Sequence, residues 1–431
     1  MQEVWSPLSG KNRGYNFGAM MSELDEKKLI YDWNTVIPVE KPERKIEFDD
    51  ETLRDGLQCP SVTDPSIEQK IEVLHLMNDM GIDSADIGLP GAGPRAYEDV
   101  YLLTKEIADS RLKIEPNVAA RTVKQDITPA IEITQKTGIP IEVCTFIGSS
   151  PIRQYVEEWT LDIMLKRSEE AVRYVVDNGL PNMFVTEDTS RAHPDTIRRL
   201  YTTAIECGAK RICVCDTVGH ATPAGVTSLI NFVKEVVKDT GMEVKIDWHG
   251  HRDRGLCLTN TIAAINAGVN RVHGTALGIG ERVGNTPMDL ILVNLKLLGY
   301  IDNDLSKLKQ YCEKVSKFCE VPLPSNYPVV GADAFRTATG VHAAAVIKAK
   351  KKGHDWLADA VYSGVPAGVF GLKQKIDIGP MSGQSNVIFW LQQQHIDPEP
   401  ELVEKIFDYA KHTNKLLTDE EVFAIIDRYK N

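Results

Sequence analysis

The sequence predicts a (β/α)8 barrel followed by a small, mostly helical C-terminal appendage. A short apolar run followed by a helix-period segment occurs eight times between residues 46 and 277. The starts of these runs lie 27 to 42 residues apart, which is the length of one strand and one crossover helix. The repeated region spans 232 residues, close to the size of about 250 residues that is typical of this fold.

The eight predicted strands are short runs rich in β-branched and apolar residues, at positions 46–48, 85–87, 114–118, 141–144, 183–185, 212–215, 244–246 and 272–275. The segments between them have helical periodicity; in residues 195–207, apolar side chains recur every three or four positions. A doubly wound sheet is the alternative fold, but it usually has fewer strands and a glycine-rich first turn. The first turn here, residues 51–56, is charged, and this favours the barrel.

The pattern changes on both sides of the barrel. We expect residues 1–44 to form an N-terminal extension, residues 45–303 the barrel domain and residues 304–431 the C-terminal helical subdomains. Residues 304–320 and 400–430 are predicted to be helical, the latter with a capping box at Thr418 and Glu421.

Composition argues against several classes of function. A formal charge of −12 disfavours a nucleic-acid surface, which would need a basic face. No apolar run approaches the roughly 20 residues of a membrane span, and the N-terminus lacks a signal-type apolar region. The eight cysteines form no Cys-x-x-Cys pair and are expected to be free, buried thiols. We therefore expect a cytoplasmic protein without nucleic-acid or membrane partners.

Two histidines at the end of the seventh predicted strand suggest a metal site. Side chains at i and i+2 of a strand point the same way, so His249 and His251 should lie side by side. In a barrel the strand ends meet on one rim, and Asp55 follows the first strand. Asn285, after the eighth strand, could add a neutral oxygen ligand. Such a mixed nitrogen and oxygen set suits a divalent cation, with zinc, manganese and magnesium all possible.

The predicted site also indicates a type of chemistry. A divalent metal with open coordination positions could hold a 2-oxo acid through its keto and carboxylate oxygens. The metal would polarise the ketone, and Arg54 would stabilise the negative charge that develops on it. A carbon nucleophile could then add to the ketone.

Three motifs resemble the 2-isopropylmalate synthase and homocitrate synthase family, at residues 52–58 (TLRDGLQ), 249–255 (HGHRDRG) and 278–285 (GIGERVGN). The resemblance extends over roughly residues 45 to 390. Enzymes of this family condense acetyl-CoA with a 2-oxo acid on a metal-bearing barrel. The resemblance therefore implies acetyl-CoA as co-substrate and the same class of condensation.

The resemblance also implies roles for further residues. Thr217 matches a residue that binds the substrate carboxylate, and Glu187 matches a polar group of the active site. His342 and Tyr362 match residues that, in the family, enter the active site from the partner subunit of a homodimer. His342 is thus a candidate acid or base, although the proton of the acetyl-CoA methyl group is not assigned to one residue.

Arg54-Asp55-Gly56 favours a 2-isopropylmalate synthase of leucine biosynthesis, with 3-methyl-2-oxobutanoate as the 2-oxo acid. Citramalate, homocitrate and Re-type citrate synthases are the alternatives, since they differ only in that acid. A 3-hydroxy-3-methylglutaryl-CoA lyase is disfavoured because the loop at 280–285 lacks the cysteine those enzymes carry. A non-catalytic metal-binding scaffold is disfavoured because it would not need Glu187, Thr217 and His342, which are not metal ligands.

Two departures from the family pattern, Arg153 in the fourth-strand loop and Pro380-Met381, leave the substrate choice and the details of coenzyme binding open. The regulatory domain of leucine-inhibited synthases is not found before Asn431, so no inhibition by leucine is expected.

Overall fold

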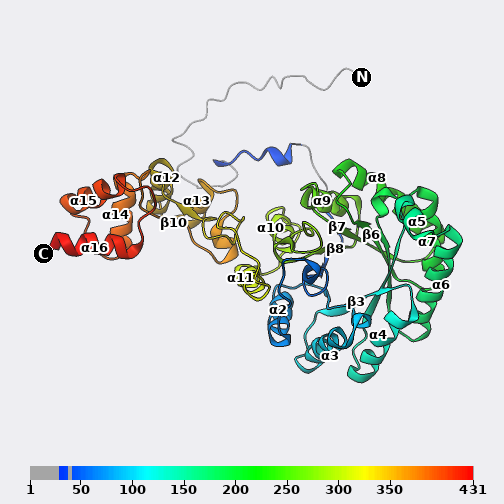
Figure 1. The fold of residues 1–431 in the computed structure, drawn as a ribbon. Coiled ribbons are helices and arrows are strands. Elements are labelled where there is room, and N and C mark those ends of the chain that lie inside the picture. The colour runs from blue at the N-terminus through cyan, green and yellow to red at the C-terminus, as the bar shows by residue number, and fades with distance from the viewer. Residues whose placement is uncertain (1–28, 37–40, 431) are drawn as a thin grey trace, which may run out of the picture. The chain divides into compact units, whose positions relative to one another are not determined.

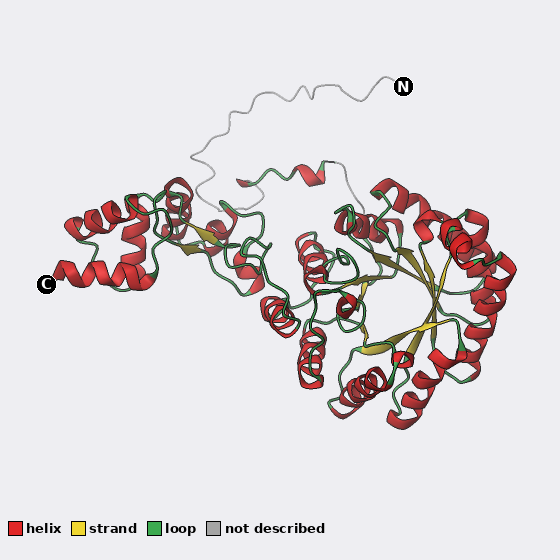
Figure 2. Ribbon diagram, in the orientation of Figure 1, coloured by secondary structure: helices red, strands yellow, loops and turns green. Residues whose placement is uncertain are grey.

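The computed structural model describes residues 29–36 and 41–430 and confirms the predicted barrel. Eight parallel strands pair in chain order and close, since β1 also pairs with β8 (Figures 1 and 2). The strands are β1 (Glu47–Asp50), β2 (Ser84–Asp86), β3 (Glu115–Arg121), β4 (Glu142–Gly148), β5 (Asn182–Glu187), β6 (Arg211–Asp216), β7 (Lys245–Gly250) and β8 (Arg271–Gly274).

The helices that follow the strands cover the outside of the barrel (Figure 2). They are α2 (Ile67–Asp79), α3 (Pro94–Asp109), α4 (Lys124–Thr137), α6 (Leu161–Asp177), α7 (Pro194–Glu206), α8 (Pro223–Thr240), α9 (Cys257–Ala267) and α10 (Met288–Leu297), with the short α5 (Pro151–Glu157) preceding α6. Ser66 and Gln69 form a capping box that starts α2. The apolar positions of α7 that carried the helix prediction, from Ile197 to Ile205, are buried.

Residues 29–36 are described by themselves and include a 3-10 turn, η2 (Trp33–Thr35). Most of the predicted N-terminal extension, residues 1–28 and 37–40, lies outside the described residues.

Beyond the barrel, the chain forms α11 (Leu308–Phe318), α12 (Gly340–Lys351), α13 (Asp355–Ala360), α14 (Gln384–Gln393), α15 (Pro400–Lys411) and α16 (Asp419–Lys430), with a two-stranded sheet of β9 (Arg336–Thr337) and β10 (Lys375–Ile376). The capping box before α16 is confirmed, because Thr418 N donates to Glu421 Oε2 and Glu421 N donates to Thr418 Oγ1. Leu308, Tyr311 and Val315 of α11 pack into the barrel core. Residues 378–426 have a core of their own. The predicted boundary at residue 304 stays a prediction.

Near the amino ends of the strands, the barrel interior contains ion pairs as well as apolar side chains. Arg271 contacts Asp247 at 2.7 Å and Glu142 at 2.6 Å. Arg211 contacts the other oxygen of Asp247 at 2.7 Å and Glu47 at 2.7 Å. Buried charges are tolerated only when such partners are present. This network forms the base on which the candidate site rests.

Tyr311 of α11 is fixed to the barrel by a hydrogen bond to Asp50. The carboxylate of Asp50 also accepts hydrogen bonds from Thr52 N and Thr52 Oγ1. Burial raises the pKa of Asp50 to about 7, against the lowering effect of these hydrogen bonds. Asp50 therefore takes up a proton on folding over the pH range between its unfolded and folded pKa values.

We expect Asp50→Asn to flatten part of the pH dependence of stability. The pKa of Asp50 is raised on folding, so its contribution to stability is complete below about pH 4 and is lost as the pH rises through about 7. Relative to the wild type, Asp50→Asn should gain up to about 1.4 kcal/mol per pH unit within that window. Urea unfolding across the window measures this gain, with the exposed Asp239→Asn as control. Parallel profiles for wild type and Asp50→Asn would contradict the prediction.

All eight cysteines are free, and seven of them are buried, as expected. In the part of the chain that the structure describes, no helix combines the length and apolar character needed to cross a bilayer.

Candidate functional site

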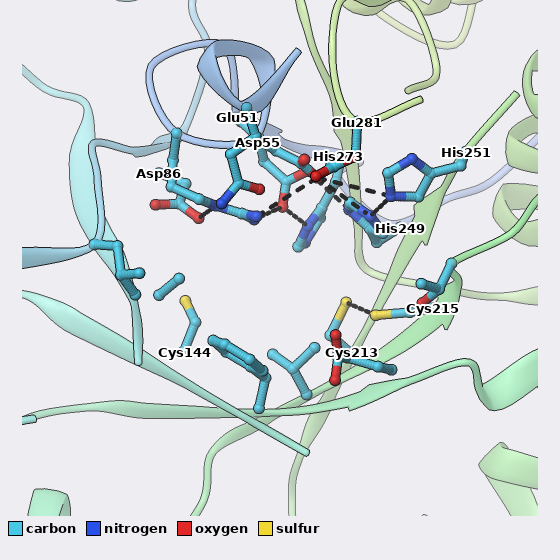
Figure 3. Close-up of a pocket in the computed structure, with 18 of the residues that line it drawn as sticks. Glu51, Asp55, Asp86, Cys144, Cys213, Cys215, His249, His251, His273 and Glu281 are labelled. Atoms are coloured by element: carbon cyan, nitrogen blue, oxygen red, sulfur yellow. Dashed lines mark hydrogen bonds and ion pairs between the residues drawn. The ribbon is translucent and has the colours of Figure 1, made fainter. Parts of the chain in front are cut away.

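A cavity of about 430 Å³ opens at the carboxyl ends of the barrel strands. Glu51, Asp55 and Asp86 lie with the three histidines on one side of it, and Cys144, Cys213 and Cys215 lie on the opposite side (Figure 3). The predicted residues that line it are Arg54, Asp55, Glu187, Thr217, His249 and His251. The sequence-derived site is thus brought together from four different strand ends.

The predicted metal ligands Asp55, His249 and His251 converge on one point. The two Nε2 atoms lie 3.1 Å apart, and Asp55 Oδ2 lies 3.6 Å from that of His249 and 3.8 Å from that of His251. Burial and the neighbouring His249 lower the pKa of His251 to about 4, so its ring is neutral at neutral pH. A carboxylate and two imidazoles at this spacing are the donor set that a divalent cation needs. The residues present therefore fit the metal.

Asn285 lies beside this group. Its Nδ2 donates to Asp55 Oδ2 at 2.9 Å, and its Oδ1 is buried without a hydrogen-bond partner among the described residues. The loop that precedes Asn285 is tightly packed. A Cβ on Gly280 would lie 2.3 Å from Asn285 Oδ1, and a Cβ on Gly284 would lie 1.9 Å from Gly278 O. Both glycines have positive φ, so the motif at 278–285 needs glycine to bring Asn285 to the site.

Arg54 is held by three carboxylates at the edge of the cavity. Its Nε donates to Asp86 Oδ2 at 2.6 Å, and its terminal nitrogens lie 3.1 Å from Glu51 Oε1 and 3.5 Å from Asp55 Oδ2. Burial would lower the pKa of Arg54, but Asp86, Asp55 and Glu51 hold it well above its usual value. The guanidinium is therefore a fixed positive charge next to the candidate metal position.

Glu187 and Thr217 face the same cavity from neighbouring strands. Burial raises the pKa of Glu187, and Arg153, 3.7 Å away, opposes this increase. Thr217 Oγ1 accepts a hydrogen bond from Asp188 N at 2.8 Å, so its hydroxyl hydrogen remains able to donate to a bound ligand. The pair combines a carboxyl group suited to proton transfer with a neutral donor.

The opposite side of the cavity is apolar. Cys144, Met183, Cys213 and Cys215 form a buried cluster with Val185 packed against it. Burial raises the pKa of Cys213 well above its usual value, so the thiol stays protonated and behaves as a small apolar group. This face can contact an aliphatic group but offers no charge.

His342 and Tyr362 do not line this cavity in the chain that contains them. Their rings pack against each other with centroids 4.2 Å apart, and both side chains are exposed. The structure thus keeps the two predicted residues together, away from the other predicted site residues.

Two buried residues next to the metal group were missed from the sequence. Glu51 Oε2 lies 2.7 Å from His249 Nδ1, and Glu51 Oε1 lies 3.0 Å from His273 Nδ1. His273 Nε2 lies 3.0 Å from Asp247 Oδ2. Glu51, His249 and His273 could formally hold a second metal. However, both nitrogens of His273 face carboxylate oxygens, so both carry hydrogen and neither is available as a ligand.

Sequence comparisons show which known proteins this chain resembles. Residues 45–315 match the model of the HMGL-like family. The homocitrate synthase AksA of Methanopyrus kandleri is 31% identical over 86% of this chain and 88% of its own length. A 2-isopropylmalate synthase of Sulfolobus acidocaldarius is 32% identical over 89% of this chain and 95% of its own.

Solved structures share the fold at lower identity. The hydroxymethylglutaryl-CoA lyase of Pseudomonas aeruginosa aligns with a TM-score of 0.55 at 18% identity, covering 64% of this chain and 94% of that one. The carboxyl transferase domain of Rhizobium etli pyruvate carboxylase aligns with a TM-score of 0.50 at 13% identity, covering 89% and 70%. At these identities the likeness supports the barrel fold alone.

Proposed function

Because the chain belongs to the HMGL-like family, we propose that it is an acyltransferase that makes 2-isopropylmalate and CoA from acetyl-CoA, 3-methyl-2-oxobutanoate and water. The methyl carbon of acetyl-CoA loses a proton and bonds to the ketone carbon of the 2-oxo acid. Water then cleaves the thioester and releases the CoA thiol. The relatives that match over most of the chain are named as synthases of this reaction class.

The polar residues predicted from the sequence each have a role in this reaction. Asp55, His249 and His251, with Asn285, would hold a divalent cation, which supplies Lewis acidity toward a ketone oxygen. Arg54 stabilises the alkoxide that develops when the ketone is attacked. Thr217 donates to the substrate carboxylate. Glu187 lies where it can move a proton, and its raised pKa suits that role.

The apolar sulfur-containing face is the observation that favours 3-methyl-2-oxobutanoate. An acid held by the metal and Thr217 would turn its side chain toward the region formed by Cys144, Met183 and Val185. An isopropyl group loses little by leaving water for such a surface, whereas a carboxylate placed there would be unpaired. Binding energy therefore favours a branched aliphatic side chain.

Arg153 supports a second candidate, a synthase that uses a dicarboxylic 2-oxo acid. Its Nε is buried without a hydrogen-bond partner among the described residues, and its Nη2 lies 3.2 Å from Glu157 Oε1 and 3.7 Å from Glu187 Oε2. A second carboxylate could pair with this cation. Homocitrate and Re-type citrate synthesis would use such acids, whereas citramalate synthesis would use the smaller pyruvate.

Release of free CoA thiol with a panel of 2-oxo acids tests the assignment. We expect kcat/KM for 3-methyl-2-oxobutanoate to exceed that for pyruvate by about 10- to 200-fold, because missing methyl groups leave an apolar pocket partly unfilled. Oxaloacetate and 2-oxoglutarate should be slower still. Faster thiol release with either dicarboxylic acid would favour the Arg153 interpretation, and faster release with pyruvate would indicate a citramalate synthase.

We also propose that the protein is a homodimer in which His342 and Tyr362 complete the partner's cavity. Both side chains are exposed, and their rings pack against each other, so another surface can contact them. Arg153 lines the cavity and lies on α5. The same helix exposes the apolar side chains of Ile152, Tyr155 and Val156. An exposed apolar helix of this kind often marks a contact surface.

A further inference from the structure

A continuous chain of hydrogen bonds and ion pairs runs from the amino ends of the barrel strands to the candidate metal position. It starts at Asp247, which Arg211 and Arg271 hold from below at 2.7 Å each. It passes through His273 and Glu51 and ends at His249. All of these side chains are buried or nearly so, and Figure 3 shows Glu51, His249 and His273 grouped on the same side of the cavity.

The chain fixes which nitrogen of His249 carries hydrogen. Glu51 in its ionised form can only accept hydrogen bonds, so the Nδ1 atom 2.7 Å away must donate one. In a neutral imidazole the other nitrogen then has a free lone pair. That nitrogen, Nε2, is the atom that faces His251 and Asp55.

Glu51 itself is fully used by its neighbours. Its Oε1 accepts from His273 and Arg54, and its Oε2 accepts from His249 and, at 3.5 Å, from Asn285 Nδ2. A carboxylate with both oxygens engaged in this way orients its partners and has no oxygen left to bind a metal directly.

We propose that Glu51, anchored by His273, is a positioning residue that holds His249 in the tautomer and orientation required to bind the divalent cation. The inference rests on the metal role in the proposed function but not on the identity of the 2-oxo acid. Partners that orient a metal-bound histidine from its second nitrogen typically contribute about 10- to 100-fold to metal affinity. The Glu51 and His273 pair should therefore set how tightly this site binds its metal.

Titration of metal-free protein with Mn²⁺ or Zn²⁺ by calorimetry, without substrate, tests the proposal. We expect Glu51→Gln to weaken binding about 10- to 100-fold, and His273→Gln to weaken it less, because Glu51 keeps its contact with Arg54. The visible absorption spectrum of bound Co²⁺ should also change in Glu51→Gln, since it reports ligand geometry. Glu106→Gln is the matched control, because Glu106 Oε1 contacts His75 Nε2 at 2.8 Å far from the cavity.

The outcomes separate the two proposals. If the wild type binds no divalent metal, the metal role itself fails. If the wild type binds metal and Glu51→Gln binds it as tightly, with the same Co²⁺ spectrum, Glu51 is not a positioning residue. Thermal unfolding checks that the variants fold. Should Glu51→Gln fail to fold, Glu51→Asp replaces it, because it retains the charge but withdraws it from His249.

Discussion

Replacing Asp55 with asparagine should remove bound metal and lower the rate of CoA release by about 10³-fold or more. Asp55 is the only carboxylate in the group formed with His249 and His251. Asparagine keeps the size of the side chain but loses its charge, so two neutral imidazoles would have to hold the cation with neutral partners alone. Lewis-acid polarisation of a ketone contributes several kcal/mol, and about 4 kcal/mol corresponds to a thousandfold in rate.

Metal content per subunit and thiol release are measured on the same Asp55→Asn preparation. Wild type stripped with a chelator should lose activity to a similar extent and regain it when metal is added, whereas Asp55→Asn should not recover. Asp109→Asn, which breaks a surface ion pair with Lys105, is the control for loss of a carboxylate. Full metal content together with wild-type turnover in Asp55→Asn would show that Asp55 is not a ligand.

The group formed by Asp55, His249 and His251 could be predicted from the sequence because each member sits at a strand end. A strand places His249 and His251 on one face, and a closed barrel brings the first and seventh strand ends to the same rim. The structure places β8 between β1 and β7, and the three side chains converge as expected. Periodicity and strand order were sufficient for this part of the site.

Glu51 and His273 could not be predicted in the same way, because their partnership depends on strand register. Asp49 pairs with His273 across β1 and β8, and Trp248 pairs with Val272 across β7 and β8. Only this register brings the inward side chains at positions 51, 247, 249 and 273 within hydrogen-bond distance of one another. A one-residue shift would turn one set outward. Residue types alone do not determine this register. A histidine inside the eighth strand was nevertheless a signal in the sequence that could have pointed to a buried polar site.

The role of His342 cannot be tested within one chain, because its predicted position is in the active site of another copy of the chain. The resemblance assigned it to the partner's active site, and periodicity within one chain cannot test that assignment. The exposed, stacked pair with Tyr362 is consistent with a surface that another subunit covers. A functional experiment on mixed subunits can decide the question.

Mixing two inactive variants, Asp55→Asn and His342→Ala, should restore activity. In a mixed dimer, one cavity combines an intact Asp55 with the intact His342 of the other subunit, and the second cavity lacks both. Random association of equal amounts gives half mixed dimers, so about a quarter of wild-type activity is expected for a symmetric dimer with shared sites. Each variant alone should be nearly inactive.

Co-expression with two affinity tags isolates the mixed dimers, and thiol release measures their activity. Asp55→Asn with Glu187→Gln is the matched negative control: both residues line the same cavity of one chain, so every mixed dimer has a defect in each cavity. Activity no greater than that of the parent variants in purified Asp55→Asn and His342→Ala mixed dimers would place His342 outside the partner's site. Failure to recover any mixed dimer would exclude the homodimer itself.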